Sequence, residues 1–179
     1  MQRKIRKAKL KLASLEVELT ETHETEGGPV TNEITMKCAG LVHDDLKKAI
    51  GKLSLHLIKI CDLRKSEHIN SETFESEDLS DFDDYSVSGF SIGGEDEHEG
   101  VTITGSRKFK SGKVLNVTTP FTKFSDENSP YEHEDELYND IEACIYEVEL
   151  YLGGKYAIKQ LELPFDEAEF HVEEDVDAA

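Results

Sequence analysis

Asp81, Asp83 and Asp84 lie within the run DLSDFDDYS and form a dense group of possible metal ligands. A calcium loop needs oxygen ligands at alternate positions, a glycine at the bend and a later glutamate that binds through both oxygens. The run does not continue in this way, because neither the glycine nor the glutamate follows at the required place. We therefore expect a solvated acidic loop here and no bound metal.

The other residue types that could do chemistry are scattered. No CxxC or HExxH pattern occurs, and no histidine stands at zinc-ligand spacing from Cys38, Cys61 or Cys144. The glycine pairs fit turns and a helix end, and no GxSxG nucleophile elbow is present. Carboxylates are abundant, but general acid–base catalysis needs one whose pKa is shifted by burial. We predict no catalytic residue, no metal and no cofactor, and hence a protein that is not an enzyme.

The charge of the chain is strongly negative and unevenly distributed. Twenty Lys and Arg against 39 Asp and Glu give a net charge of −19, which disfavours nucleic acid or an anionic membrane and favours a basic protein partner. Residues 1–15 carry six basic side chains and residues 101–125 carry five, with no acid in either stretch. Residues 66–99 hold twelve acids and residues 160–179 hold eight, without Lys or Arg.

The cysteines and the apolar runs predict a cytoplasmic location. Each cysteine lies in an apolar pattern, which predicts buried, reduced thiols in a reducing compartment. No apolar run is long enough for a secretion signal or a membrane helix.

Strand and helix patterns divide the chain into two parts. Alternation in KIRKAKLKLASLEVELTET predicts one long strand with a bulge at Ala13-Ser14, and NEITMKC predicts its hairpin partner. HDDLKKAIGKLSLHLIKICDL repeats apolar residues at three and four, which predicts a helix with Asp44 and Asp45 in its first turn. Later, YSVSGFSI, VTITGSRKF and KVLNVTTPFTKF predict three strands, and SPYE predicts a second helix capped by Ser129.

These elements predict an α+β fold, a curved antiparallel sheet with two helices on one face. The order also fits two degenerate hairpin–helix halves, residues 1–64 and 85–165, joined by an acidic linker at 65–84. This linker is either flexible or an ordered loop anchored by Phe74, Leu79 and Phe82. We expect one domain over residues 1–165 and a disordered acidic tail over 166–179.

The segment QLELPF, residues 160–165, has two interpretations. It resembles the hexapeptide motif that binds the bacterial sliding clamp. The resemblance implies that Gln160 is the polar anchor and that Leu161, Leu163 and Phe165 enter the apolar cleft of the clamp. An extended segment stiffened by Pro164 suits such docking. The alternative is a final strand, in which Leu161 and Leu163 share a face.

A second resemblance concerns the first helix. The stretch VHDDLKKAIGKLSLHL, between a hairpin and an acidic loop, resembles small acidic proteins of bacteriophages and prophages that have no settled activity. The resemblance implies a role directed at the host or accessory to DNA metabolism. We therefore predict a non-enzymatic, phage-encoded accessory protein. It would act on DNA-replication or DNA-processing machinery by protein–protein contact, with the sliding clamp or a basic DNA-binding protein as partner.

Two other functions remain open at the sequence level. The negative charge fits an acidic nucleic-acid mimic that inhibits a host defence protein. The basic stretches instead fit a sheet surface that binds single-stranded nucleic acid by phosphate contacts and stacking. The residues of that surface would be Lys7, Lys9, Lys11, Arg107, Lys108, Phe109 and Lys110.

Overall fold

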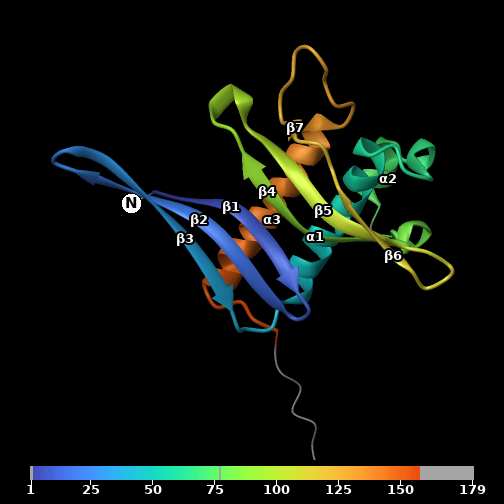
Figure 1. Ribbon diagram of the computed structural model, residues 1–179, viewed down its shortest axis with the longest axis horizontal. Coiled ribbons are helices and arrows are strands. Elements are labelled where there is room, and N and C mark those ends of the chain that lie inside the picture. Colours follow the sequence, from blue (N-terminus) through green and yellow to red (C-terminus); the bar gives the residue numbers. More distant parts are fainter. Residues whose placement is uncertain (1, 77, 158–179) are drawn as a thin grey trace, which may run out of the picture.

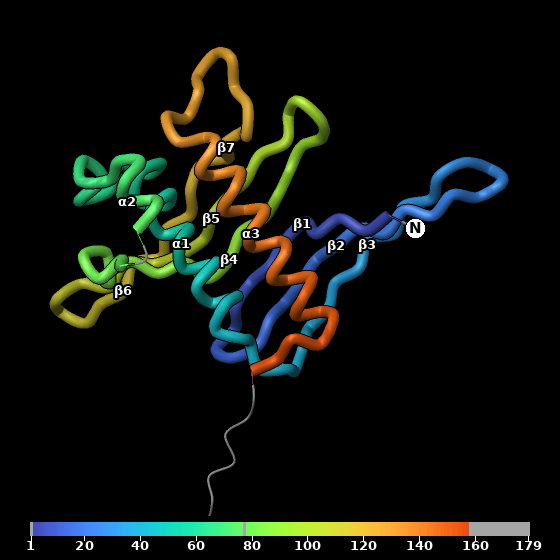
Figure 2. Tube along the Cα trace, turned by 180° about the vertical axis from the view of Figure 1, so that it is seen from behind, coloured from blue at the N-terminus to red at the C-terminus, as the bar shows by residue number. Residues whose placement is uncertain are grey.

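The computed structural model describes residues 2–76 and 78–157, which form an antiparallel sheet with two long helices on one face. Figure 1 looks onto the uncovered face of the sheet, and Figure 2 shows the helices across the other face. The strand order is β3-β2-β1-β4-β5-β6, and β7 pairs with β5. The elements are β1 (Gln2–Lys11), β2 (Ser14–Thr25), β3 (Gly28–Cys38), α1 (Asp44–Ile60), α2 (Ser71–Glu75), β4 (Tyr85–Gly93), β5 (Gly100–Lys108), β6 (Val114–Thr118), β7 (Thr122–Lys123) and α3 (Glu134–Leu152). The predicted fold class is confirmed.

Each half of the chain contains a three-stranded meander followed by a long helix. Strands β1, β2 and β3 precede α1, and β4, β5 and β6 precede α3. The halves are thus larger than the predicted hairpin–helix units. The two meanders join along β1 and β4 through three residue pairs, Lys7↔Ser91, Ala8↔Phe90 and Lys9↔Gly89.

Gly89 allows the two meanders to approach each other closely. A Cβ atom at this position would lie 2.2 Å from the carbonyl oxygen of Ala8. Register shifts flank the contact, between Ile5 and Lys7 in β1 and between Val87 and Gly89 in β4. Such bulges bend and twist a strand, so they account for curvature where the halves meet.

The first predicted strand is two strands in the structure. The chain reverses between β1 and β2, where Leu12 has a φ of 56°. The phase slip at Ala13-Ser14 therefore marks a tight turn and not a bulge. Leucine seldom takes this left-handed conformation, so its type gave no indication of a turn. The predicted strand over residues 113–124 is also divided, into β6 and β7 on either side of Pro120.

Helix α1 has the predicted amphipathic pattern and the predicted first turn. His43 precedes the helix, and its Nδ1 accepts a hydrogen bond from the N–H of Asp45 at 3.2 Å. Asp44 and Asp45 lie in the first turn, where the helix dipole favours negative charge. The buried stripe against the sheet includes Leu46, Ile50, Leu53 and Leu57.

Helix α3 begins at Glu134, so the predicted cap at Ser129 is wrong. The residues before the helix place Tyr131 and His133 against side chains of other elements. The ring of His133 lies 4.8 Å from that of Phe74, measured between centroids. The helix itself begins after these residues, at Glu134. The predicted stripe on α3 is confirmed, because Leu137, Ile141, Cys144 and Val148 are buried.

The acidic segment between the halves is folded where the structure describes it. It contains α2 and two short 3-10 turns, Ser66–His68 and Ser80–Phe82. Phe74 and Phe82 are buried in a small cluster with Leu55 and Ile58 of α1, and Leu79 packs partly against it. The ordered alternative is therefore correct, because apolar side chains spaced through the acidic run reach the helix.

The cysteines differ in burial. Cys144 is buried, as predicted, whereas Cys38 and Cys61 are half-buried. All three thiols are free. Burial raises the pKa of each thiol above its ordinary value, which disfavours the reactive thiolate.

Candidate functional site

The sheet face opposite α1 and α3 is turned toward the viewer in Figure 1, and we call it the open face. Polar side chains lie on it. Cross-strand pairing arranges these side chains in two rows from β2 to β5. The rows are Glu18, Lys7, Ser91 and Thr102, and Glu16, Lys9, Gly89 and Thr104. The part formed by β1 and β2 is charged. The part formed by β4 and β5 consists of glycine and small hydroxyl-bearing residues.

The lysines of β1 predicted for nucleic-acid binding lie on the open face, and two of the three are paired with glutamates of β2. The Nζ of Lys7 lies 2.6 Å from Oε1 of Glu18. Lys11 donates to Glu16, and this hydrogen bond lowers the pKa of the Glu16 carboxyl. Between them, Lys9 forms no ion pair with any residue that the structure describes. Because phosphate contacts need available cations, these pairs weaken the open face as a nucleic-acid surface.

Arg107 lies away from these lysines, in a stack of aromatic rings. Its guanidinium carbon is 5.3 Å from the ring centroid of Tyr85 and 5.2 Å from that of Phe109. Its Nε lies 3.4 Å from Oδ2 of Asp84. Arg107 alternates with the exposed Lys108 along β5, so the two side chains point to opposite faces.

The tip of the β5–β6 hairpin combines basic and apolar side chains, all of them exposed. We call this region the hairpin tip. Its members are Lys108, Phe109, Lys110, Lys113, Val114 and Leu115. The seven residues predicted to bind nucleic acid are therefore divided, with three on the open face, three at the hairpin tip and Arg107 behind it. They do not form one surface.

A buried polar cluster joins α1 to α3 and was not predicted. His56 is fully buried, and its Nδ1 lies 3.1 Å from the hydroxyl of Tyr131. Its Nε2 lies 3.2 Å from Oδ2 of Asp140. The ring of Phe74 stacks on the imidazole at a centroid distance of 4.5 Å. The only indication in the sequence was a histidine between the apolar residues Leu55 and Leu57 of an amphipathic helix.

The chain of carboxylate, imidazole and hydroxyl in this cluster has the order used in nucleophilic catalysis. The surroundings of the tyrosine hydroxyl do not suit that role. Burial raises the pKa of Tyr131, and nearby glutamates raise it further. Burial lowers the pKa of His56, although Asp140 opposes this shift. Neither His56 nor Tyr131 lines any of five hollows in the described part of the chain, which include the one in the acidic segment. The cluster therefore satisfies buried polar groups between two helices.

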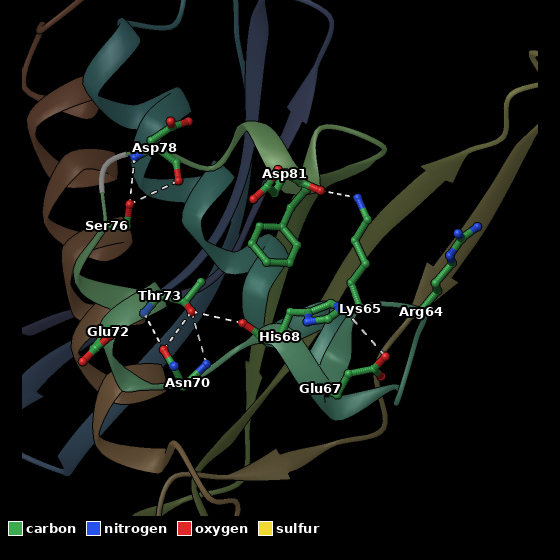
Figure 3. A pocket seen from close by; sticks show the side chains of 11 residues that line it. Arg64, Lys65, Glu67, His68, Asn70, Glu72, Thr73, Ser76, Asp78 and Asp81 are labelled. Carbon is green, nitrogen blue, oxygen red and sulfur yellow. Dashed lines mark hydrogen bonds and ion pairs between the residues drawn. The ribbon is translucent and has the colours of Figure 1, made fainter.

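The largest hollow lies in the acidic segment and has a volume of about 820 Å³ (Figure 3). Side chains of both charges line it, including Lys65, His68, Glu72 and Asp81. The ammonium group of Lys65 donates to the carbonyl oxygen of Asp81. Within the described ranges, no three His, Cys, Asp or Glu side chains are arranged to hold a metal ion. The hollow thus offers a polar surface, in which Nε2 of His68 lies 3.9 Å from Oε1 of Glu67.

The predicted docking residues Gln160, Leu161, Leu163 and Phe165 lie outside the described residues. The chain just before them is attached to the connection between β3 and α1. Tyr156 forms an antiparallel bridge with Val42. The N–H of Ala157 donates to the carbonyl oxygen of Leu41 at 2.9 Å.

In the described ranges, no helix has both the length and the hydropathy needed to cross a membrane. Comparison with known protein families, with characterised proteins and with solved structures finds no match. The functional inference therefore rests on the surfaces of this chain.

Proposed function

We propose that the protein is a non-enzymatic accessory of DNA replication or processing that binds the bacterial sliding clamp through residues 160–165. The position of the motif along the chain carries this proposal. Ala157 is held to the folded body by its hydrogen bond to Leu41, and Gln160 follows three residues later. A motif next to a fixed point would be presented to a partner at the surface of the body.

The side chains of the motif supply the binding energy in this proposal. Leu161, Leu163 and Phe165 would fill one apolar cleft, with Gln160 as a polar contact. Pro164 restricts the backbone before binding, so less conformational entropy is lost when the segment docks.

The buried polar cluster supports a role without catalysis. Burial shifts the pKa of both His56 and Tyr131, and the ring of Phe74 stacks on the imidazole. A substrate would have to displace this ring to reach the imidazole. The cluster is therefore better suited to holding the helices together.

Isothermal titration of the full chain with a purified bacterial sliding clamp tests the proposal. Leu163→Ala combined with Phe165→Ala removes two apolar anchors. Each buried side chain of this kind contributes about 1.5–3 kcal/mol, and 1.4 kcal/mol corresponds to a factor of about ten. Binding should therefore weaken by at least about a hundredfold. The control is Phe170→Ala combined with Val172→Ala, in the same acidic tail, which should keep the affinity within about twofold.

Thermal unfolding of the same variants separates docking from a structural role. If the motif only docks, the double variant and its control unfold at the same temperature as the wild type. A loss of several kcal/mol, seen as a fall in Tm of about 2–4 °C per kcal/mol, would mean that Leu163 and Phe165 belong to the core. That result, or a wild-type chain that does not bind the clamp, refutes the proposal.

A further inference from the structure

The two outer edges of the sheet are protected to different degrees. Strand β3 carries Pro29, Glu33 and Lys37, and natural proteins use proline and charges to prevent pairing at an edge. Strand β6 has the sequence VLNVT, without charge or proline. Its side chains Val114 and Leu115 are 59% and 48% exposed. An apolar, unprotected edge is a template for another strand.

The backbone groups on the outer edge of β6 can be identified from the pairing. The N–H of Phe109 donates to the carbonyl of Lys113, and the N–H of Thr119 donates to the carbonyl of Ile103. Hydrogen-bonded positions alternate along an antiparallel strand. Positions 115 and 117 therefore bond to β5, whereas 114, 116 and 118 direct their N–H and C=O groups outward. Within the described ranges, no strand pairs with these outward groups.

The charge around β6 indicates the kind of segment that would pair with it. Residues 101–125 carry five basic side chains and no acid, in a chain of net charge −19. Lys108, Lys110 and Lys113 are exposed, and none of them forms an ion pair with another residue in the described ranges. An occupant with carboxylates beside its strand would complement these lysines.

We propose that β6 binds an extended, acidic peptide segment of a partner protein, which adds to the sheet as a further strand. The outward N–H and C=O groups of Val114, Asn116 and Thr118 would bond the backbone of the peptide. Its apolar side chains would pack on Leu115. Its carboxylates, on the opposite face of the added strand, would approach the lysines of the hairpin tip. A second copy fits less well, because each chain carries a charge of −19. The proposal uses none of the residues assigned to clamp binding.

The sharpest test variant is Asn116→Pro. Position 116 directs its N–H outward, so proline removes a bond to the peptide and leaves the bonds between β5 and β6 in place. Proline is tolerated on an edge strand where its nitrogen faces solvent. Asn116→Ala is the matched control, because it removes the same side chain but keeps the N–H. Val114→Glu is a second variant, which adds a negative charge to the edge without changing the backbone.

The probe is a fluorescein-labelled peptide of sequence Glu-Val-Asp-Ile-Glu-Val-Asp, followed by fluorescence anisotropy with the full chain. We expect Asn116→Pro and Val114→Glu each to weaken binding by about tenfold or more, and Asn116→Ala to change it by less than about threefold. Added salt should weaken binding, and a peptide with lysine in place of each acid should not bind. Thermal unfolding checks that the variants fold.

Three results would overturn this proposal. The first is a wild-type chain that does not bind the acidic peptide, or a pair of edge variants that bind it with the same affinity as the wild type. The second is a dimer in sedimentation that Asn116→Pro dissociates, since the occupant would then be a second copy. The third is a set of zero-length cross-links between Lys113 and the chain's own residues 166–177, which would assign the edge to that tail.

Discussion

Replacing Gly89 by alanine should destabilise the protein, because Gly89 lies where the two meanders meet. The added Cβ would lie 2.2 Å from the carbonyl oxygen of Ala8 and 2.9 Å from Cα of Lys9, closer than real Cβ atoms come. Both neighbours are backbone atoms, so only a separation of β1 from β4 relieves the clash. Overpacking costs about 1–3 kcal/mol. We expect a value near about 3 kcal/mol, because this contact consists of three residue pairs.

Gly51→Ala is the matched control for this substitution. Gly51 lies in α1, and a Cβ atom there would meet nothing within 4 Å. Alanine favours the helix over glycine by about 0.5–1 kcal/mol, so this variant should gain stability. Urea titrations give both free energies of unfolding. If Gly89→Ala is as stable as the wild type, β1 and β4 do not approach as described.

Four further substitutions test other parts of the structure by urea unfolding. Phe74→Ala should cost about 3–5 kcal/mol because the ring is buried, whereas Phe121→Ala, at 48% exposure, should change stability by less than about 0.5 kcal/mol. Equal effects would contradict the packing of the acidic segment. Tyr151→Phe should cost about 1 kcal/mol, because its hydroxyl donates to the carbonyl of Gly40; no change would mean that this bond is not formed. Burial lowers the pKa of His56 from 6.5, so the unfolded state binds this proton more readily. The contribution of neutral His56 to the free energy of unfolding is therefore fully present above pH 6.5 and is lost as the pH decreases below 6.5. His56→Gln should reduce this slope between pH 7 and 5, and an unchanged slope would refute the assignment.

Periodicity in the sequence predicted the helices and the sheet class well. The stripe that contains Leu46 and Ile50 is strong because each helix must bury one face against the sheet. The alternation of Val101 and Ile103 likewise identified β5. These patterns depend only on residues close together in the sequence, and the predicted elements are present in the structure.

Other features depend on contacts between distant residues, and local patterns could not reveal them. The turn at Leu12 uses a residue type that rarely takes a positive φ. The start of α3 is decided by Tyr131, which reaches His56 on another helix, so the cap pattern at Ser129 was misleading. The pairing of Lys7 with Glu18 could be predicted only if the turn between β1 and β2 was recognised, and that turn was predicted as a bulge. The lysines of β1 were therefore identified from the sequence, but the glutamates of β2 that pair with them were not.

The central claim is that the segment 160–165 serves a partner and not the fold. Hydrogen exchange followed by mass spectrometry, with the full chain alone and with the bacterial sliding clamp, tests this claim most directly. The account predicts that the amides of Leu161, Leu163 and Phe165 exchange rapidly in the free protein and become protected only when the clamp is added. Strong protection already in the free protein, unchanged by the clamp, would contradict it and assign these residues to a strand.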